Sequence, residues 1–291
     1  MKSVKEVPAG LRITAYISLL CAAVFAAAQT LMVNFMYEND VHLFKQGSVA
    51  PTVFNIALAV FVLAVFIIFC AAKNASFPDE QAKISSPAVI FSALCAFTAI
   101  TSGLHNLISF AMLLKMSQAY QFTRHDIFSI IAAVMSIPAF IYFIINAFAK
   151  DISRRVKAGF GTLCIVWSIM YLLSIYFDMT GPINDPIRII NQFAVLSVMM
   201  YMVYEVRFLL EDPRPGYYIC FSLVAVVLLG ASSVSNIICT LTGALDFSDN
   251  LIYFFFELSM LCYVLSRIIP YLRLKTQAPL PEDTAKETEQ E

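Results

Sequence analysis

Charged residues are scarce in this chain. Asp, Glu, Lys and Arg make up only 13% of the 291 residues, whereas hydrophobic residues make up 60%. An ordinary soluble domain carries roughly 25% charged residues, so this shortage excludes a conventional water-soluble fold and indicates that lipid surrounds most of the chain. The net charge of −1 is no basis for a nucleic-acid partner, and we expect none.

Several motifs of catalysis and cofactor binding are also absent. The chain has no H-E-x-x-H or G-x-S-x-G motif and no Walker A or G-x-G-x-x-G loop. Only one of its three histidines, His105, lies well inside an apolar segment, which disfavours haem ligation by paired histidines. Every lysine lies at or beyond the end of such a segment, which disfavours a retinal pigment. We therefore expect no enzyme activity, no cofactor and no metal site.

What the sequence does contain is a series of long apolar runs. A helix needs about 20 apolar residues to cross roughly 30 Å of hydrocarbon. A long run without strand-like alternation can satisfy its backbone in lipid only as a helix. The fold class predicted is an all-α, polytopic membrane bundle of eight transmembrane helices. The runs cover residues 11–36, 51–73, 87–114, 124–149, 156–177, 186–210, 215–242 and 249–272.

The ends of these runs carry local signals of helix structure. Pro51, Pro87, Pro186 and Pro215 stand near the start of a run, where the missing N–H of proline is tolerated. Pro138 lies inside the fourth run and predicts a kink. The seven cysteines all fall in apolar runs and form no C-x-x-C pair, so we interpret them as small packing residues. The acidic segment 273–291 is predicted to be a disordered tail.

Orientation follows from the Lys and Arg residues in alternate loops. The loops predicted to lie on the same side of the membrane as both termini, counted together with the termini, hold 15 of them, among them Arg207 and Arg267. The loops on the other side hold 4. Because positive charge is retained on the cytoplasmic side, we expect a protein of the cell membrane with both termini in the cytoplasm. An A-x-A site at Ala26 to Ala28 leaves open a cleaved signal peptide and seven spans. The apolar run continues past that site to Phe35, which favours retention.

Weak internal similarity suggests a duplication. The first four runs match the last four in order, with Arg12/Arg155 and Cys21/Cys164 at one offset and Asn106/Asn236 at another. The predicted halves, 11–149 and 155–272, each contain an even number of spans and would be parallel repeats within a single transmembrane domain, 1–272. Shared apolar composition is the alternative explanation for these matches.

Polar residues inside the runs are the candidate binding residues, because ionisable groups are costly at that depth and usually face a bundle interior. Glu257 is the clearest acid well inside a span. Glu205 stands beside Arg207 near a cytoplasmic end, so we expect it to reach the interface. The predicted substrate-binding set gathers in the outer half of the membrane. It consists of Glu257, His105, Asn106, Asn55, Asn191, Gln192 and Asn236.

Two functions remain open on the sequence. The first is a permease-like transporter of a small polar or cationic solute, with Glu257 as the anionic contact and Asn residues orienting the solute. The second is a membrane sensor or interaction scaffold that signals to a cytoplasmic partner through the basic loop KDISRRVK and the acidic tail. Asn and Gln side chains that only join helices to one another are the structural alternative to a binding site.

Overall fold

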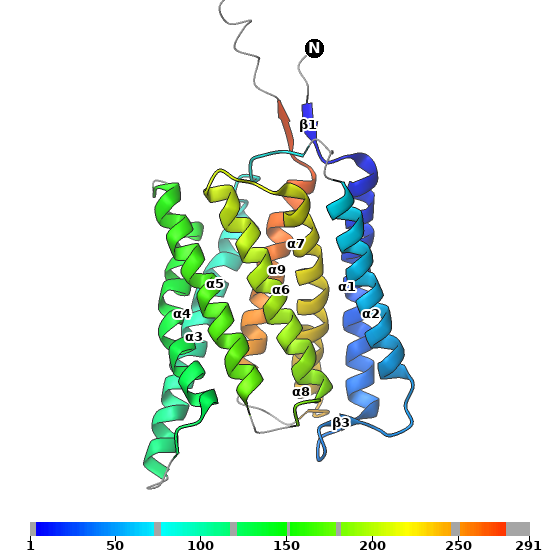
Figure 1. Cartoon of the computed structure of the whole chain (residues 1–291), viewed down its shortest axis with the longest axis vertical. Helices are drawn as coiled ribbons and strands as arrows, with labels where there is room; N and C mark the ends of the chain where they lie inside the picture. Colours follow the sequence, from blue (N-terminus) through cyan, green and yellow to red (C-terminus); the bar gives the residue numbers. More distant parts are fainter. Residues whose placement is uncertain are drawn as a thin grey trace, which may run out of the picture.

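The computed structural model describes residues 4–72, 77–116, 121–149, 152–178, 182–245 and 251–277. Long helices lie side by side and form one bundle (Figure 1). Eight of them are long and apolar enough to cross a membrane, which confirms the predicted fold class. The helices are α1 Ala9–Met36, α2 Ala50–Ala71, α3 Ser86–Met116, α4 Arg124–Phe148, α5 Arg154–Phe177, α6 Pro186–Leu209, α7 Pro215–Leu229, η1 Gly230–Val234, α8 Ser235–Leu241 and α9 Leu251–Leu272.

The predicted signals at the helix starts are confirmed. Pro51, Pro186 and Pro215 each occupy the first turn of a helix. α4 begins with a capping box, in which the Thr123 hydroxyl accepts from the Asp126 N–H and the Asp126 carboxylate accepts from the Thr123 N–H at 2.7 Å. Such reciprocal bonds satisfy backbone donors that have no partner inside the helix. α7, η1 and α8 follow one another without a break and form the seventh span.

Two short antiparallel strand pairs mark the opposite sides of the bundle. β1 (Val4–Glu6) pairs antiparallel with β4 (Lys275–Gln277), and β2 (Tyr37–Glu38) pairs with β3 (Leu43–Phe44). The first pair joins the two ends of the described chain at the top of Figure 1, as an even number of spans requires. We call the side of the bundle with β1 and β4 the terminal side. The opposite side, with β2 and β3, is the distal side. Most of the predicted tail, 278–291, lies outside the described residues.

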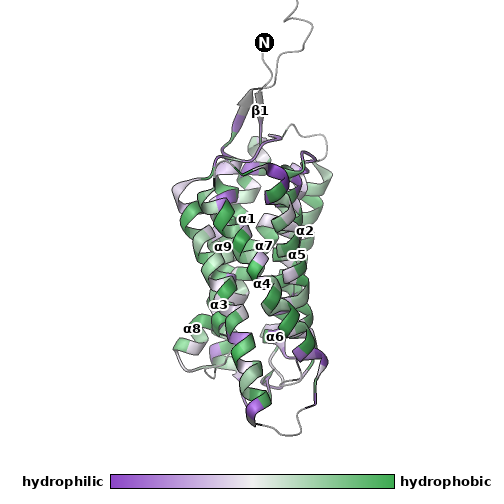
Figure 2. Ribbon diagram, turned by 90° about the vertical axis from the view of Figure 1, so that its left-hand side faces the viewer, coloured by the Kyte–Doolittle hydropathy of each residue, from purple (hydrophilic) through white to green (hydrophobic). Residues whose placement is uncertain are grey.

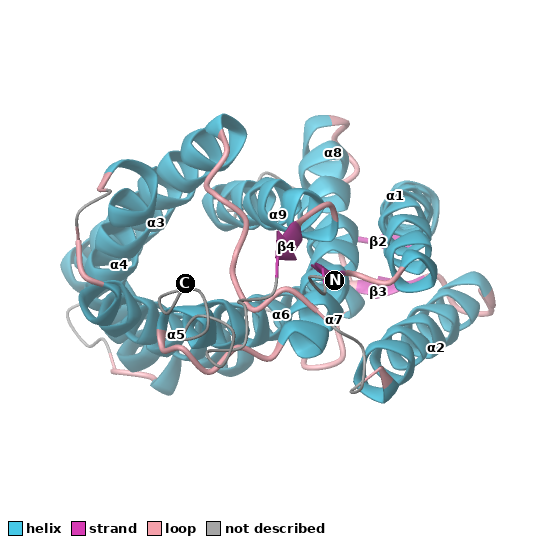
Figure 3. Ribbon diagram, turned by 90° about the horizontal axis from the view of Figure 1, so that it is seen from above, coloured by secondary structure: helices cyan, strands magenta, loops and turns pink. Residues whose placement is uncertain are grey.

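Helix α7 is the centre of the bundle. It packs against α1, α2, α6 and α9, and its described residues are almost entirely buried. The helices α3, α4, α5, α6, α7 and α9 pack in sequence, and α9 returns to α3, so they close a ring (Figure 3). Helices α1 and α2 lie outside that ring against α7. Apolar residues extend along the helices, and hydrophilic residues gather towards their ends (Figure 2).

Aromatic side chains from α5 and α9 meet across the ring. Tyr171 stacks on Tyr253 with ring centroids 4.6 Å apart, and Trp167 meets Phe256 edge-on at 4.7 Å. Such pairs add roughly 0.5–1.5 kcal/mol beyond the burial of their area. They hold α9 opposite α5 and so fix the position of Glu257, one residue after Phe256.

Helices α3 and α4 approach each other closely at Gly103. A Cβ atom at Gly103 would lie 2.9 Å from the Ser136 Cβ and 3.0 Å from the Ala133 carbonyl oxygen. Only glycine allows the two backbones to come this near.

The described residues do not support the predicted repeat. Helix α4 packs closely against α5, but the pair that a repeat would make equivalent, α9 and α1, has no comparable contact. The repeat stays a prediction.

Candidate functional site

A buried polar cluster joins four helical elements in the distal half of the bundle. Ser232 of η1 stands at its centre, with its Oγ 2.5 Å from Glu257 Oε2 of α9 and 2.8 Å from Asn191 Oδ1 of α6. Asn236 of α8 donates its Nδ2–H to the same Asn191 Oδ1 at 3.0 Å. We call Asn191, Ser232, Asn236 and Glu257 the distal cluster. Three of these four belong to the set predicted from the sequence.

The π-helix η1 determines which residues reach the distal cluster. Ser232 and Ser233 are adjacent, yet Ser233 bonds the Leu229 carbonyl of its own helix at 2.6 Å, whereas Ser232 bonds residues of α6 and α9. A π-helix widens one turn, which shifts the phase of the residues that follow, and such turns occur frequently at functional sites. The turn aligns Ser232 and Asn236 with Asn191 on α6.

The neighbours of Glu257 compensate the charge of its carboxylate only in part. Its side chain is only 1% exposed. Within the described residues, Oε2 has the Ser232 hydroxyl, Oε1 has no hydrogen-bond partner, and no ion pair includes Glu257. A buried carboxylate is normally paired with a cation or accepts several hydrogen bonds. The distal cluster therefore contains a carboxyl group with one oxygen that has no hydrogen-bond partner in the described residues, beside a hydroxyl and an amide carbonyl.

The other predicted site residues do not join this cluster. Asn55 is exposed on α2, which packs against α1 and α7. Gln192 is half-buried on α6, next to Asn191. His105 and Asn106 are half-buried on α3, and Asn106 lies within hydrogen-bonding reach of Tyr253, one turn before Glu257 on α9. Of the predicted substrate-binding set, this structure brings together three residues in the distal cluster, with a neighbouring contact through Asn106.

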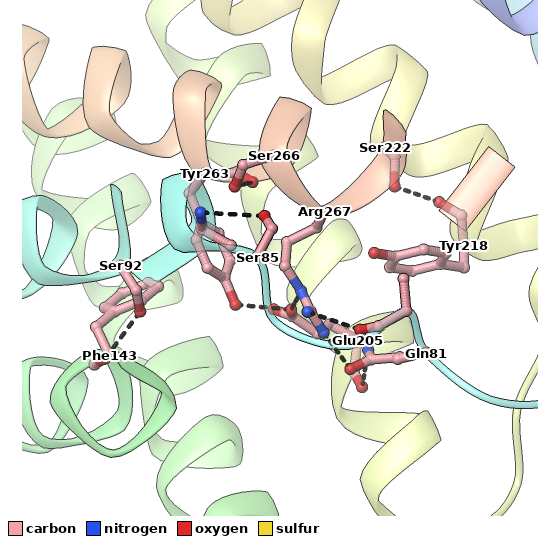
Figure 4. Close-up of polar contacts among 12 residues, drawn as sticks. Gln81, Ser85, Ser92, Phe143, Glu205, Tyr218, Ser222, Tyr263, Ser266 and Arg267 are labelled. Atoms are coloured by element: carbon pink, nitrogen blue, oxygen red, sulfur yellow. Dashed lines mark hydrogen bonds and ion pairs between the residues drawn. The ribbon is translucent and has the colours of Figure 1, made fainter. Parts of the chain in front are cut away.

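A second buried cluster lies near the terminal side, around Glu205 of α6 (Figure 4). Glu205 Oε1 accepts from the Tyr263 hydroxyl at 2.8 Å and from Arg267 Nε at 3.3 Å, and Oε2 accepts from the Tyr142 hydroxyl at 3.3 Å. The Arg267 guanidinium also donates to the Gln81 side chain. We call Gln81, Tyr142, Glu205, Tyr263 and Arg267 the terminal cluster.

The terminal cluster corrects two interpretations of the sequence. Glu205 is 2% exposed and paired with Arg267, so the expectation that it reaches the interface is wrong. Arg267 is 7% exposed inside α9 and does not belong among the loop cations. The sequence did carry a signal of this pair, because Glu205 and Arg267 have opposite charges and each lies several residues inside an apolar run. Arg207, which seemed the natural neighbour of Glu205, instead pairs with Asp212.

The distal ends of α5 and α6 are fixed by polar contacts at and just beyond the ends of these spans. Asp185 caps α6 by accepting from the Ile187 N–H at 2.9 Å, and it accepts from the Tyr37 hydroxyl at 3.3 Å. Burial raises the pKa of Asp185, and burial together with the Asp185 carboxylate raises the pKa of Tyr37. Arg188 donates to the Ile175 and Tyr176 carbonyls at the end of α5. These contacts set the register of α6 and hence the depth of Asn191.

Comparison of the chain with protein-family models, with curated proteins and with solved structures finds no match.

Proposed function

We propose that this chain is a permease-like transporter of a small polar, in particular cationic, solute, with Glu257 as the anionic contact. One observation carries the proposal: Glu257 Oε1 is buried inside the bundle without a hydrogen-bond partner in the described part of the chain. An ionisable group at this depth is costly and is retained where it contacts a substrate or ion. Asn191 and Ser232 would orient the solute beside the carboxyl group.

The interrupted seventh span supports the same proposal. Transporter sites commonly lie where a helix departs from regular α geometry, because altered backbone and side-chain directions there create polar contacts inside the membrane. Here η1 interrupts the span at Gly230–Val234 and provides Ser232. Glu257 lies six residues after the start of α9, about 9 Å along the helix axis. A solute entering from the distal side would reach it before crossing the bundle.

Uptake by proteoliposomes tests this function. Guanidinium serves as a permanently charged small cation, and sodium as a second probe. Uptake of either above that of protein-free vesicles is expected for the unmodified chain and is expected to fall to background in Glu257→Gln. The matched control is Glu211→Gln, at an exposed acid of the terminal side, which should retain full uptake. Full uptake by Glu257→Gln would show that Glu257 is not the anionic contact of the solute. No uptake of either probe would overturn transport of small cations.

A sensor or scaffold is the second candidate, and the terminal cluster favours it. Arg267 and Tyr271 of α9 bond Gln81, the Ala82 carbonyl and the Pro78 carbonyl, so α9 connects Glu257 to the segment before α3. A ligand at Glu257 that shifts α9 would move this segment. Guanidinium-dependent hydrogen exchange at residues 77–85 without any uptake would favour sensing, and uptake favours transport. Under either proposal the chain binds its ligand without chemical conversion.

We also infer that the terminal side faces the cytoplasm of the cell membrane. With the buried Arg267 and Arg188 both removed from the count, the remaining Lys and Arg residues still divide 14 against 3 in favour of this side. The positive-inside rule then orients the protein. A fluorescent-protein fusion after residue 291 should be bright, and a periplasmic or secretory reporter at the same position should be inactive. The opposite pattern would reverse the orientation.

A further inference from the structure

The distal cluster does not contain enough protons for an ionised Glu257. Ser232 Oγ lies 2.8 Å from Asn191 Oδ1 and 2.5 Å from Glu257 Oε2. If Glu257 is ionised, both neighbours are acceptors, yet a hydroxyl group has a single proton to donate. Asn236 Nδ2 donates to Asn191 Oδ1 and contributes nothing to Glu257. One of the two short contacts of Ser232 would then join two acceptors without a proton between them.

We propose that Glu257 holds a proton in this conformation, and that the transporter exchanges this proton for its cationic solute. The protonated Oε2–H donates to Ser232 Oγ, and Ser232 donates to Asn191 Oδ1, which also accepts from Asn236. The contacts then form an unbroken chain of donors and acceptors. The inference rests on the proposed function and names its coupling ion.

Reversing the two amide groups is the alternative arrangement, because amide orientation is assigned from the hydrogen-bond network. Asn191 would then donate to Ser232 and to Asn236, and the serine proton would be available for an ionised Glu257. That arrangement places a full charge in the bundle with one hydrogen bond and, within the described part of the chain, no paired cation. The effective penalty for a buried ion is several kcal/mol, so the neutral carboxylic acid is favoured.

Among the described residues, none forms an ion pair with Glu257 that would supply the missing positive charge. α5 presents Tyr171, α9 itself presents Tyr253, and α3 contributes Asn106 through its contact with Tyr253. His105 precedes Asn106 on α3 and forms no ion pair with Glu257 within the described residues. From α6, η1 and α8 come the neutral residues of the distal cluster. Arg267 lies ten residues further along α9, about 15 Å away along the axis, and is already paired with Glu205.

Charge balance sets the stoichiometry of the exchange. Binding of one monovalent cation to the Glu257 carboxylate requires that one proton leave Oε2 for the water on the side from which the cation enters. The cluster is neutral before and after this step. When the cation leaves on the other side, a proton from that side returns to Glu257. Uptake of one cation is thus coupled to export of one proton.

Infrared spectroscopy of the full chain in lipid vesicles tests the proton directly. The spectrum at about pH 7 should contain the C=O stretch of a protonated carboxylic acid, although an exposed glutamate with a pKa of about 4.3 would be ionised. The band should disappear in Glu257→Gln and persist in Glu211→Gln. A spectrum without this band, or a band that persists in Glu257→Gln, would overturn the proposal. This measurement does not depend on transport.

Coupling is tested with guanidinium and a pH-sensitive dye inside the vesicles. Guanidinium entry should raise the internal pH, with about one proton leaving per ion, and Glu257→Gln should abolish both movements. Guanidinium uptake without proton movement would overturn the exchange and leave the transport function standing. The carboxylic-acid band without guanidinium or sodium uptake would support the proton site and overturn the transport function.

Discussion

Glu205 and Glu257 are equally buried but differently surrounded. Their side chains are 2% and 1% exposed. Glu205 has the Arg267 cation and two tyrosine hydroxyls, whereas Glu257 has one serine hydroxyl and an oxygen without a partner in the described residues. Depth alone therefore does not distinguish a structural acid from a binding acid. The distinction lies in whether the surroundings compensate the charge.

The two acids are also connected through α9. This helix contributes Glu257 to the distal cluster and, ten residues later, Arg267 to the terminal cluster. The compensated pair fixes α9 against α6 near the terminal side. The uncompensated acid stands near the start of α9, six residues after Leu251. We infer that the terminal cluster is the fixed point about which any rearrangement of the distal cluster occurs.

The largest effect is expected from Glu205→Gln, because it leaves the Arg267 guanidinium buried without a counter-charge. Removing one partner of a buried pair typically costs about 3–5 kcal/mol. Thermal unfolding of the purified protein in detergent should show a correspondingly lower midpoint. The double variant Glu205→Gln/Arg267→Met removes both charges and should recover most of the loss. A Glu205→Gln protein as stable as the unmodified chain would remove the distinction between the two acids.

The same substitution at the second acid, Glu257→Gln, should change the free energy of unfolding by less than about 1 kcal/mol, within the range of a net neutral hydrogen bond. The amide N–H replaces the proposed carboxylic proton and donates to Ser232. Unfolding measured beside Glu205→Gln, under identical conditions, provides the comparison. If both variants lost the same stability, Glu257 would be a structural acid and its role in binding would be untenable.

The sequence was sufficient for the spans and for three of the four residues of the distal cluster. Long apolar runs leave the backbone no alternative to the helix, so the eight spans were predictable to within a few residues. Asn191, Asn236 and Glu257 were found because polar residues inside spans are few. The role of Ser232 was not predictable, because it depends on the phase shift produced by η1.

The terminal cluster was missed for a different reason. Glu205 and Arg267 are 62 residues apart and lie on different helices. Helical periodicity gives the face that each residue occupies but not which helices become neighbours, and Arg207, two residues from Glu205, was the nearer candidate in sequence. The closed ring, in which α9 returns to α3 and reaches α6, is a property of packing among several helices.

The smallest effect is expected from Arg154→Ala. This variant tests whether burial, and not the distance between the two charges, determines how much an ion pair stabilises the protein. Arg154 and Glu211 are 3.3 Å apart, the same distance as Arg267 and Glu205, and also lie near the terminal side. Their side chains are 69% and 75% exposed, however, so water already solvates both charges. Exposed pairs contribute about 0–1 kcal/mol, and the unfolding midpoint in detergent should shift little. A shift comparable to that of Glu205→Gln would mean that ion pairing on the terminal side stabilises the protein irrespective of burial. The contrast between the two acids would then reflect the pairing itself, and burial of Glu257 would lose its significance as a sign of a binding site.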